Sequence, residues 1–134
     1  MMRLHAVTVL VDDYDTAIAH YVDDLGFHLI EDTDLGSGKR WVRVAPDPDG
    51  SVTLLLAVAT TEAQRSAIGR QAGERVAFFL HTTDFAGYYA RLVRRGVRLT
   101  EEPRYEAYGT VVVFEDRYGN RWDLIQPVMS TSES

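Results

Sequence analysis

The second half of this 134-residue chain repeats the first half, and the repetition limits the folds that the chain can adopt. In residues 13–27, an aspartate opens a segment with apolar residues at helical spacing, and Leu-Gly-Phe closes it; residues 84–97 repeat this pattern with Gly-Val at the end. Two turn-forming segments, 47–50 and 116–119, also correspond. Three matches in the same order indicate a duplicated supersecondary unit. The period of about 70 residues is too long for the 20–50 residues of common repeat proteins.

Each half has the pattern of a strand, a helix and three further strands. Alternating side chains predict a first strand at residues 6–11, and apolar residues at helical spacing predict a helix that ends at Gly26, with Tyr21 in the core and His20 on the surface. The remaining strands are expected at 27–30, 41–44 and 52–58, with a turn at 34–39. In the second half, strands are expected at 76–80, 97–100, 110–114 and 121–125, and a helix at 85–95.

This order predicts an α+β fold in which two βαβββ modules form a curled mixed sheet around a cup-shaped cleft. One domain is expected over residues 1–128, with module one at 4–59, a linker at 60–74 and module two at 75–127. The linker is polar, and a short helical turn is expected at 62–68. The Ser/Thr-rich tail, residues 129–134, is predicted to be disordered.

Composition narrows the classes of partner. Twenty acidic residues against 14 basic ones give a net charge of −6, which disfavours nucleic acid and anionic membranes as partners. Cysteine is absent, so disulfides and thiolate metal sites are excluded. No apolar run approaches the roughly 20 residues of a membrane span, and a cytoplasmic location is expected.

The closing segment, residues 114–127, together with the strand that ends in Val11-Asp12-Asp13 and the run from Ala17 to Phe27, resembles the vicinal oxygen chelate superfamily. This superfamily includes glyoxalases, bleomycin-resistance proteins and extradiol dioxygenases, and the resemblance extends from about residue 4 to 127. It implies the cup-shaped fold and, in metal-dependent members, four inward ligands: a His in the first strand and a Glu in the last strand of each module. It also implies a homodimer.

The four ligand positions of the resemblance are located by counting from the shared turns. Seven residues before each helix-leading aspartate lie Ala6 and Ala77; four residues after each turn glycine lie Leu54 and Asp123. Alanine and leucine side chains carry no lone pair for a metal ion. The usual four-ligand metal site is therefore predicted to be absent, no cofactor is predicted, and a divalent metal is disfavoured.

Three residues of module two are expected to face the cup. Phe79 and His81 share strand parity, and Asp123 occupies the last-strand position. Asp123 and His81 are the candidate catalytic residues, acting as a general base and a proton shuttle. The alternatives are an ion-paired carboxylate that serves the structure and a hydrogen-bonded histidine at the rim.

Four further side chains are candidate ligand contacts. Trp41 and Arg43 alternate with valines that suit the helix-covered face, so they can stack on and neutralise an aromatic or anionic ligand. Tyr105 and Tyr108 precede a strand and can line the mouth of a pocket. The alternative is that these residues pack at an edge or within a loop.

Two main classes of function follow, and a ligand-sensing or partner module is a third alternative. The first is a metal-independent protein that binds a small organic molecule in the cleft between the modules. The second is an enzyme, a metal-assisted lyase, isomerase or dioxygenase with a divergent site. The acidic surface modestly favours a cationic or neutral ligand.

Overall fold

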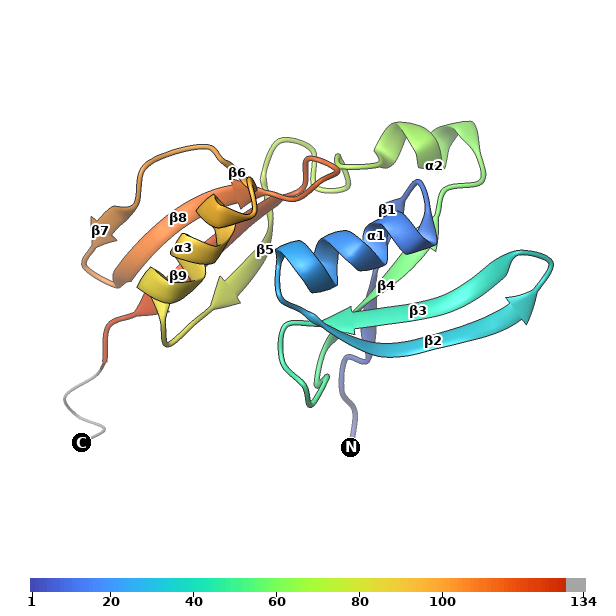
Figure 1. Ribbon diagram of the computed structural model, residues 1–134, viewed down its shortest axis with the longest axis horizontal. Helices are drawn as coiled ribbons and strands as arrows, with labels where there is room; N and C mark the ends of the chain where they lie inside the picture. Colours follow the sequence, from blue (N-terminus) through green and yellow to red (C-terminus); the bar gives the residue numbers. More distant parts are fainter. Residues whose placement is uncertain (130–134) are drawn as a thin grey trace. The chain divides into compact units, whose positions relative to one another are not determined.

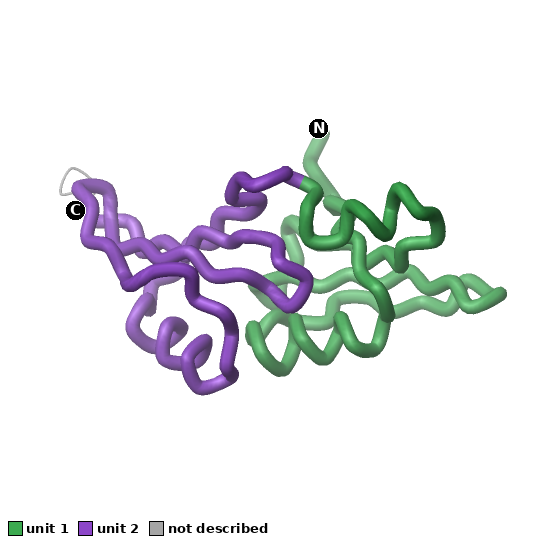
Figure 2. The backbone as a smooth tube through the Cα atoms, turned by 90° about the horizontal axis from the view of Figure 1, so that it is seen from above, with its two compact units in different colours: residues 1–71 green, residues 72–134 purple. Residues whose placement is uncertain are grey.

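The computed structural model describes residues 1–129 and divides the chain into two compact units, residues 1–71 and residues 72 onward (Figure 2). The predicted tail begins within this range at Met129, which is exposed, and its other five residues lie outside the described residues. Each unit has its own sheet and helix. We call them unit 1 and unit 2.

Unit 1 contains a four-stranded sheet in the order β1-β4-β3-β2 (Figure 1). Its elements are β1 (Ala6–Val11), α1 (Tyr14–Ala19), a π-helical turn η1 (His20–Asp24), β2 (His28–Gly36), β3 (Lys39–Ala45), β4 (Thr53–Val58) and α2 (Glu62–Ala67). β1 pairs with β4 in parallel, whereas the other neighbours are antiparallel. The short helix expected at 62–68 is confirmed as α2.

Unit 2 repeats this arrangement in the order β5-β9-β8-β6, with one additional strand, β7, that also pairs with β8. Its elements are β5 (Val76–His81), α3 (Phe85–Arg94), β6 (Arg98–Leu99), β7 (Arg104–Glu106), β8 (Gly109–Glu115) and β9 (Arg121–Pro127). β5 pairs with β9 in parallel, as β1 does with β4. The α+β class and the duplicated βαβββ order are confirmed.

The core of unit 1 lies between one sheet face and the helical segment. The helical segment contributes Tyr21 and Leu25. The sheet contributes four fully buried valines and a leucine, namely Val9, Val11, Val42, Val44 and Leu56. Removing their apolar surface from water stabilises the unit by roughly 1.5–3 kcal/mol for each large side chain. Residues of opposite parity are therefore left on the other face of the sheet.

The helical segment of unit 1 differs from its prediction. Asp13 caps α1 by accepting hydrogen bonds from the Thr16 amide and hydroxyl, both at 2.8 Å, and these bonds lower the pKa of the Asp13 carboxyl. After Ala19 the helix widens into the π-helical turn η1, in which the Leu25 amide donates to the His20 carbonyl at 3.1 Å. His20 is consequently buried, not on the surface as its helical spacing predicted.

The β2–β3 hairpin is longer than predicted. Pairing continues to Gly36 and Lys39, so the expected six-residue turn shrinks to Ser37 and Gly38. Both turn residues have positive φ, 57° and 80°, as tight hairpin turns require. The added strand residues include Arg40, which contributes to the site described below.

A buried carboxylate organises the β8–β9 turn in unit 2. Asp116 accepts hydrogen bonds from the amides of Tyr118 and Asn120, both at 3.0 Å, and from the indole of Trp122 at 3.1 Å. Asp116 and Asn120 are both buried. All of these bonds lie within seven consecutive residues, so they fix the geometry with which β9 leaves the turn.

Candidate functional site

One face of the unit 2 sheet gathers three of the residues predicted from the sequence. The parallel register pairs Phe79 with Asp123 and His81 with Ile125, so Phe79, His81 and Asp123 project from the same face. The opposite face carries the buried residues Trp122 and Leu124, against which α3 lies. Phe79 is 66% exposed, which is unusual for a phenylalanine in mid-strand.

Asp123 is the chemically unusual residue of this face. Its Oδ1 atom is buried and has no hydrogen-bond partner within the described residues. Burial raises the pKa of the Asp123 carboxyl, the positive charge of Arg104 opposes this rise, and Glu101 adds to it. An acceptor in this state can bind a hydrogen-bond donor from a ligand without first breaking a protein contact.

Arg104, whose positive charge acts on Asp123, is already committed to other carboxylates. Arg104 donates to Glu101 at 2.6 Å and to Glu106 at 3.0 Å. These two acids neutralise Arg104, so it compensates Asp123 only weakly. Asp123 therefore presents a partly buried acceptor on an exposed apolar face.

His81 lies two residues further along the sheet than Asp123. A rise of about 3.3 Å per residue separates the two positions by roughly 6–7 Å along the strands. His81 is exposed, and its side chain makes no hydrogen bond within residues 1–129. The two candidate catalytic groups therefore share a face without contacting each other directly.

Tyr105 and Tyr108 are not brought together with Asp123. Tyr105 pairs with Thr110, which pairs with Gln126, and these positions have the parity of the α3-covered face. There Tyr105 lines a separate cavity of about 450 Å³, together with Phe85 and Met129. Tyr108 lies in the β7–β8 turn, where more than half of its surface is exposed.

In unit 1, Arg43 and Trp41 lie on the face opposite the core, as their alternation predicted. Arg43 donates to Glu31 at 2.8 Å and to Thr53 at 3.2 Å, and only 13% of its side chain is exposed. The hydrogen bond from Arg43 is the main reason that the pKa of Glu31 is lowered, and Trp41 makes a smaller contribution in the same direction. Arg43 is thus a neutralised residue, paired with Glu31 on the same sheet face as Trp41.

Trp41 also lines a cavity of about 460 Å³ that lies wholly within unit 1. The pairing of β3 with β4 includes only three residue pairs and stops at Val42 and Leu56. Beyond this point the two strands separate, and both line the cavity. Its other lining residues come from β1, α1, α2, the β2–β3 turn and the segment before α2, and include Thr8, Leu10, Tyr14 and Gln64.

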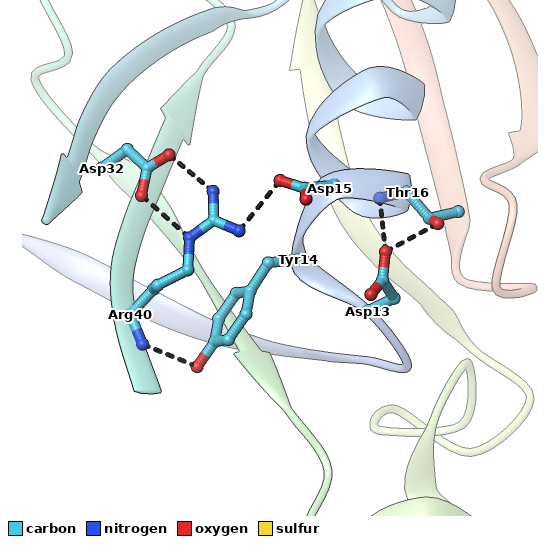
Figure 3. A network of polar contacts seen from close by, with 6 residues as sticks. All are labelled: Asp13, Tyr14, Asp15, Thr16, Asp32 and Arg40. Carbon is cyan, nitrogen blue, oxygen red and sulfur yellow. Dashed lines mark hydrogen bonds and ion pairs between the residues drawn. The ribbon is translucent and has the colours of Figure 1, made fainter. Parts of the chain in front are cut away.

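A polar network holds the edge of this cavity (Figure 3). The Arg40 amide, which lacks a strand partner on this side, donates to the Tyr14 hydroxyl at 3.2 Å. The Arg40 guanidinium binds Asp32 on β2 at 2.7 Å and Asp15 on α1 at 2.9 Å, and its Cζ lies 5.2 Å from the centroid of the Tyr14 ring. The network ties the hairpin to the helix and lowers the pKa of Asp32.

The metal positions of the resemblance can now be located by register. Thr8 and Phe79 each lie five residues before the aspartate that caps the following helix, and they pair with Leu55 and Asp123 respectively. Leu55, not Leu54, is therefore the equivalent of Asp123, because the unit 1 turn is one residue longer. Leu54 is buried on the core face beside Val44.

The residues present do not fit a four-ligand metal ion. Ala6, Leu55 and Ala77 offer no donor atom, and Asp123 is the one carboxylate of the set. Within residues 1–129, no three His, Asp or Glu side chains lie close enough together to hold a metal. The same part of the chain has no helix with the length and apolar character needed to cross a membrane.

A model of the Glyoxalase/Bleomycin resistance protein/Dioxygenase superfamily matches residues 3–124. The chain belongs to this superfamily. Among curated proteins, an uncharacterized protein of Shewanella frigidimarina is 49% identical to this chain over 121 residues, which are 90% of each chain. YurT of Bacillus subtilis is 31% identical over 93% of this chain and 99% of the relative.

Solved structures of the superfamily agree with this fold. UcmS2 has a TM-score of 0.79 and 32% identity, covering 93% of this chain and 98% of that one. TnmS3, described as an antibiotic binding protein from Streptomyces sp. CB03234, has a TM-score of 0.73 and 27% identity, covering 96% and 98%.

Sequence reasoning missed the cavity of unit 1 and its polar edge. Arg40 and Tyr14 carried no motif, because the network depends on where β3 parts from β4. The available signal was the run 32–38, in which Asp32 and Asp34 alternate with uncharged residues before a Gly-Ser-Gly turn, as in a long hairpin.

Proposed function

We propose that this superfamily member binds a small organic molecule and releases it chemically unchanged, without the four-ligand metal site of the metal-dependent branch. The observation that carries the proposal is the replacement of three donor positions by Ala6, Leu55 and Ala77 on an otherwise complete fold. The likeness to TnmS3, an antibiotic binding protein, supports the same class of function.

Two groups of residues serve this proposed function. In unit 1, Trp41 supplies an aromatic surface at the cavity, on the same sheet face as the Arg43–Glu31 ion pair. In unit 2, Asp123 supplies an unpartnered acceptor beside the exposed ring of Phe79. We propose that the protein is a cytoplasmic homodimer. Size-exclusion chromatography with light scattering tests the oligomeric state.

The test is a binding screen followed by recovery of the compound. A panel of antibiotics and planar natural products is screened by thermal shift, and each hit is incubated with a large excess of compound and analysed by mass spectrometry. We expect to recover each compound unchanged. We also expect that Trp41→Ala weakens the binding of hits in unit 1 and that Asp123→Asn weakens the binding of hits in unit 2. Turnover of a hit would contradict the proposal.

The state of Asp123 favours a second candidate, an acid–base enzyme. A carboxyl whose pKa is raised by burial can act as a general acid or base nearer to neutral pH, and His81 on the same face can relay a proton. In that case, product formation would be lost in Asp123→Asn, whereas binding would persist. Metal-assisted lyase, isomerase or dioxygenase chemistry would need donors other than Ala6, Leu55 and Ala77, beside Asp123.

A further inference from the structure

The charged side chains that line the cavity of unit 1 are opposite in sign to the net charge of the chain. The net charge of the protein is −6, yet the two charged residues that line this cavity, Lys39 and Arg40, are both basic. Among its described lining residues there is no aspartate or glutamate. The net negative charge of the chain favours a cationic or neutral ligand, whereas the charged residues that line this cavity favour an anionic one.

The two cations differ in availability. Arg40 is bound by two carboxylates, Asp32 and Asp15, and its charge is already compensated. Lys39, the single lysine of the chain, is exposed and makes no ion pair within residues 1–129. Lys39 is thus the one uncompensated charge at this cavity within the described chain.

The remaining walls suit a flat apolar body. Trp41 forms one wall, and the side chains of Leu10, Leu55 and Ala57 come from the neighbouring strands β1 and β4. Lys39 and Trp41 are separated by one residue of β3, so they have the same parity. The volume of about 460 Å³ lies within the range of 300–1,000 Å³ typical of small-molecule sites.

We infer that this cavity takes a planar aromatic molecule that carries an acidic group, with its ring against Trp41 and its anionic group toward Lys39. The inference rests on the proposed binding function and names its ligand class. An aromatic acid gains both the stacking and the charge contact, whereas an aromatic amine would meet an uncompensated cation.

Three matched probes test the inference: 2-naphthoate, the neutral 2-acetylnaphthalene and the cationic 2-naphthylmethylamine. The chain has two tryptophans, so its ¹H–¹⁵N spectrum contains two indole signals, which Trp41→Phe assigns. Titration with 2-naphthoate is expected to shift the Trp41 signal and to leave unchanged that of Trp122, which is buried and bonded to Asp116.

Charge variants separate the lysine contact from simple stacking. Lys39→Gln is expected to weaken 2-naphthoate binding about fivefold, since a partly exposed ion pair is worth roughly 1 kcal/mol at 1.4 kcal/mol per decade. Lys39→Arg is expected to restore the affinity. Arg70→Gln, an exposed position outside the cavity, serves as the matched control and is expected to have no effect.

Two results would overturn the inference in different ways. If the amine or the ketone bound as tightly as 2-naphthoate, the acidic ligand class would be wrong and the binding function would stand. If none of the probes shifted the Trp41 indole at millimolar concentration, the cavity would not be the binding site. The function proposed for Asp123 would then be decided by the Asp123→Asn test alone.

Discussion

Replacing Asp123 with leucine should stabilise the protein at neutral pH. The structure supplies the reason: Oδ1 of Asp123 is buried without a partner, and the equivalent position of unit 1 already holds a leucine, Leu55. A buried acceptor without a hydrogen bond costs about 1–3 kcal/mol. Asp123→Leu is therefore expected to raise the free energy of unfolding by that amount, while removing the hydrogen-bond acceptor that the proposed ligand requires.

The gain should also depend on pH, with a definite sign. Burial raises the pKa of folded Asp123 above the unfolded value of about 3.9, so the folded state holds its proton to higher pH than the unfolded state does. Between these two pKa values the wild type loses stability as pH rises. The advantage of Asp123→Leu must then grow through this window and level off above the folded pKa.

Urea unfolding of the wild type and the variant, from about pH 4 to pH 8, measures this difference directly. Other carboxylates contribute equally to both proteins, so the difference in unfolding free energy isolates residue 123. Asp49→Leu, at an exposed turn position, is the control and should show no comparable gain. An advantage that shrank as pH rose would mean that Asp123 is a stabilising, paired carboxylate, and the argument would fail.

Three further predictions concern the frame of the site. Arg40→Gln should raise the pKa of Asp32. In the wild type, the lowered pKa of Asp32 contributes stability that is lost as the pH falls through that pKa. The variant should therefore lose less stability than the wild type on acidification below about pH 4, as followed by circular dichroism. Asp116→Ala leaves buried donors without an acceptor and should cost about 3 kcal/mol or more in urea unfolding, with Asp116→Asn costing less. Gly109→Ala places a Cβ against the Gln126 carbonyl and should lower the melting temperature by an amount equivalent to about 1–3 kcal/mol, whereas Gly73→Ala, which has open space around it, should show only the cost of its positive φ of 67°.

The sequence predicted what depends on periodicity. Side chains alternate between the two faces of a sheet along each strand. This alternation predicts the strand at residues 6–11, the duplicated order, and the shared face of Phe79, His81 and Asp123. Counting between motifs was less reliable. The count from Gly50 selected Leu54, because a single extra residue in the turn of unit 1 reverses which face is reached.

Features that depend on how elements meet were not predictable. Nothing local indicates that β3 separates from β4 beyond Val42, and this separation creates the cavity of unit 1. The π-helical turn in which His20 is buried depends on which carbonyls accept hydrogen bonds from the amides after Ala19, such as the bond from the Leu25 amide to the His20 carbonyl. The sequence predicts Tyr105 only as a residue at the mouth of a pocket, because nothing in it indicates the strand β7, whose pairing places Tyr105 on the α3-covered face.

The buried Asp116 turn bears on the order in which unit 2 assembles. Its hydrogen bonds join residues at most six apart, so the β8–β9 hairpin can form with little loss of loop entropy. The parallel pairing of β5 with β9 must close a loop of more than 40 residues and is expected to form later. Substitutions at Phe79 and His81 should consequently accelerate unfolding and leave the folding rate nearly unchanged. The candidate site would then be built on the pairing that sets the lifetime of the native state.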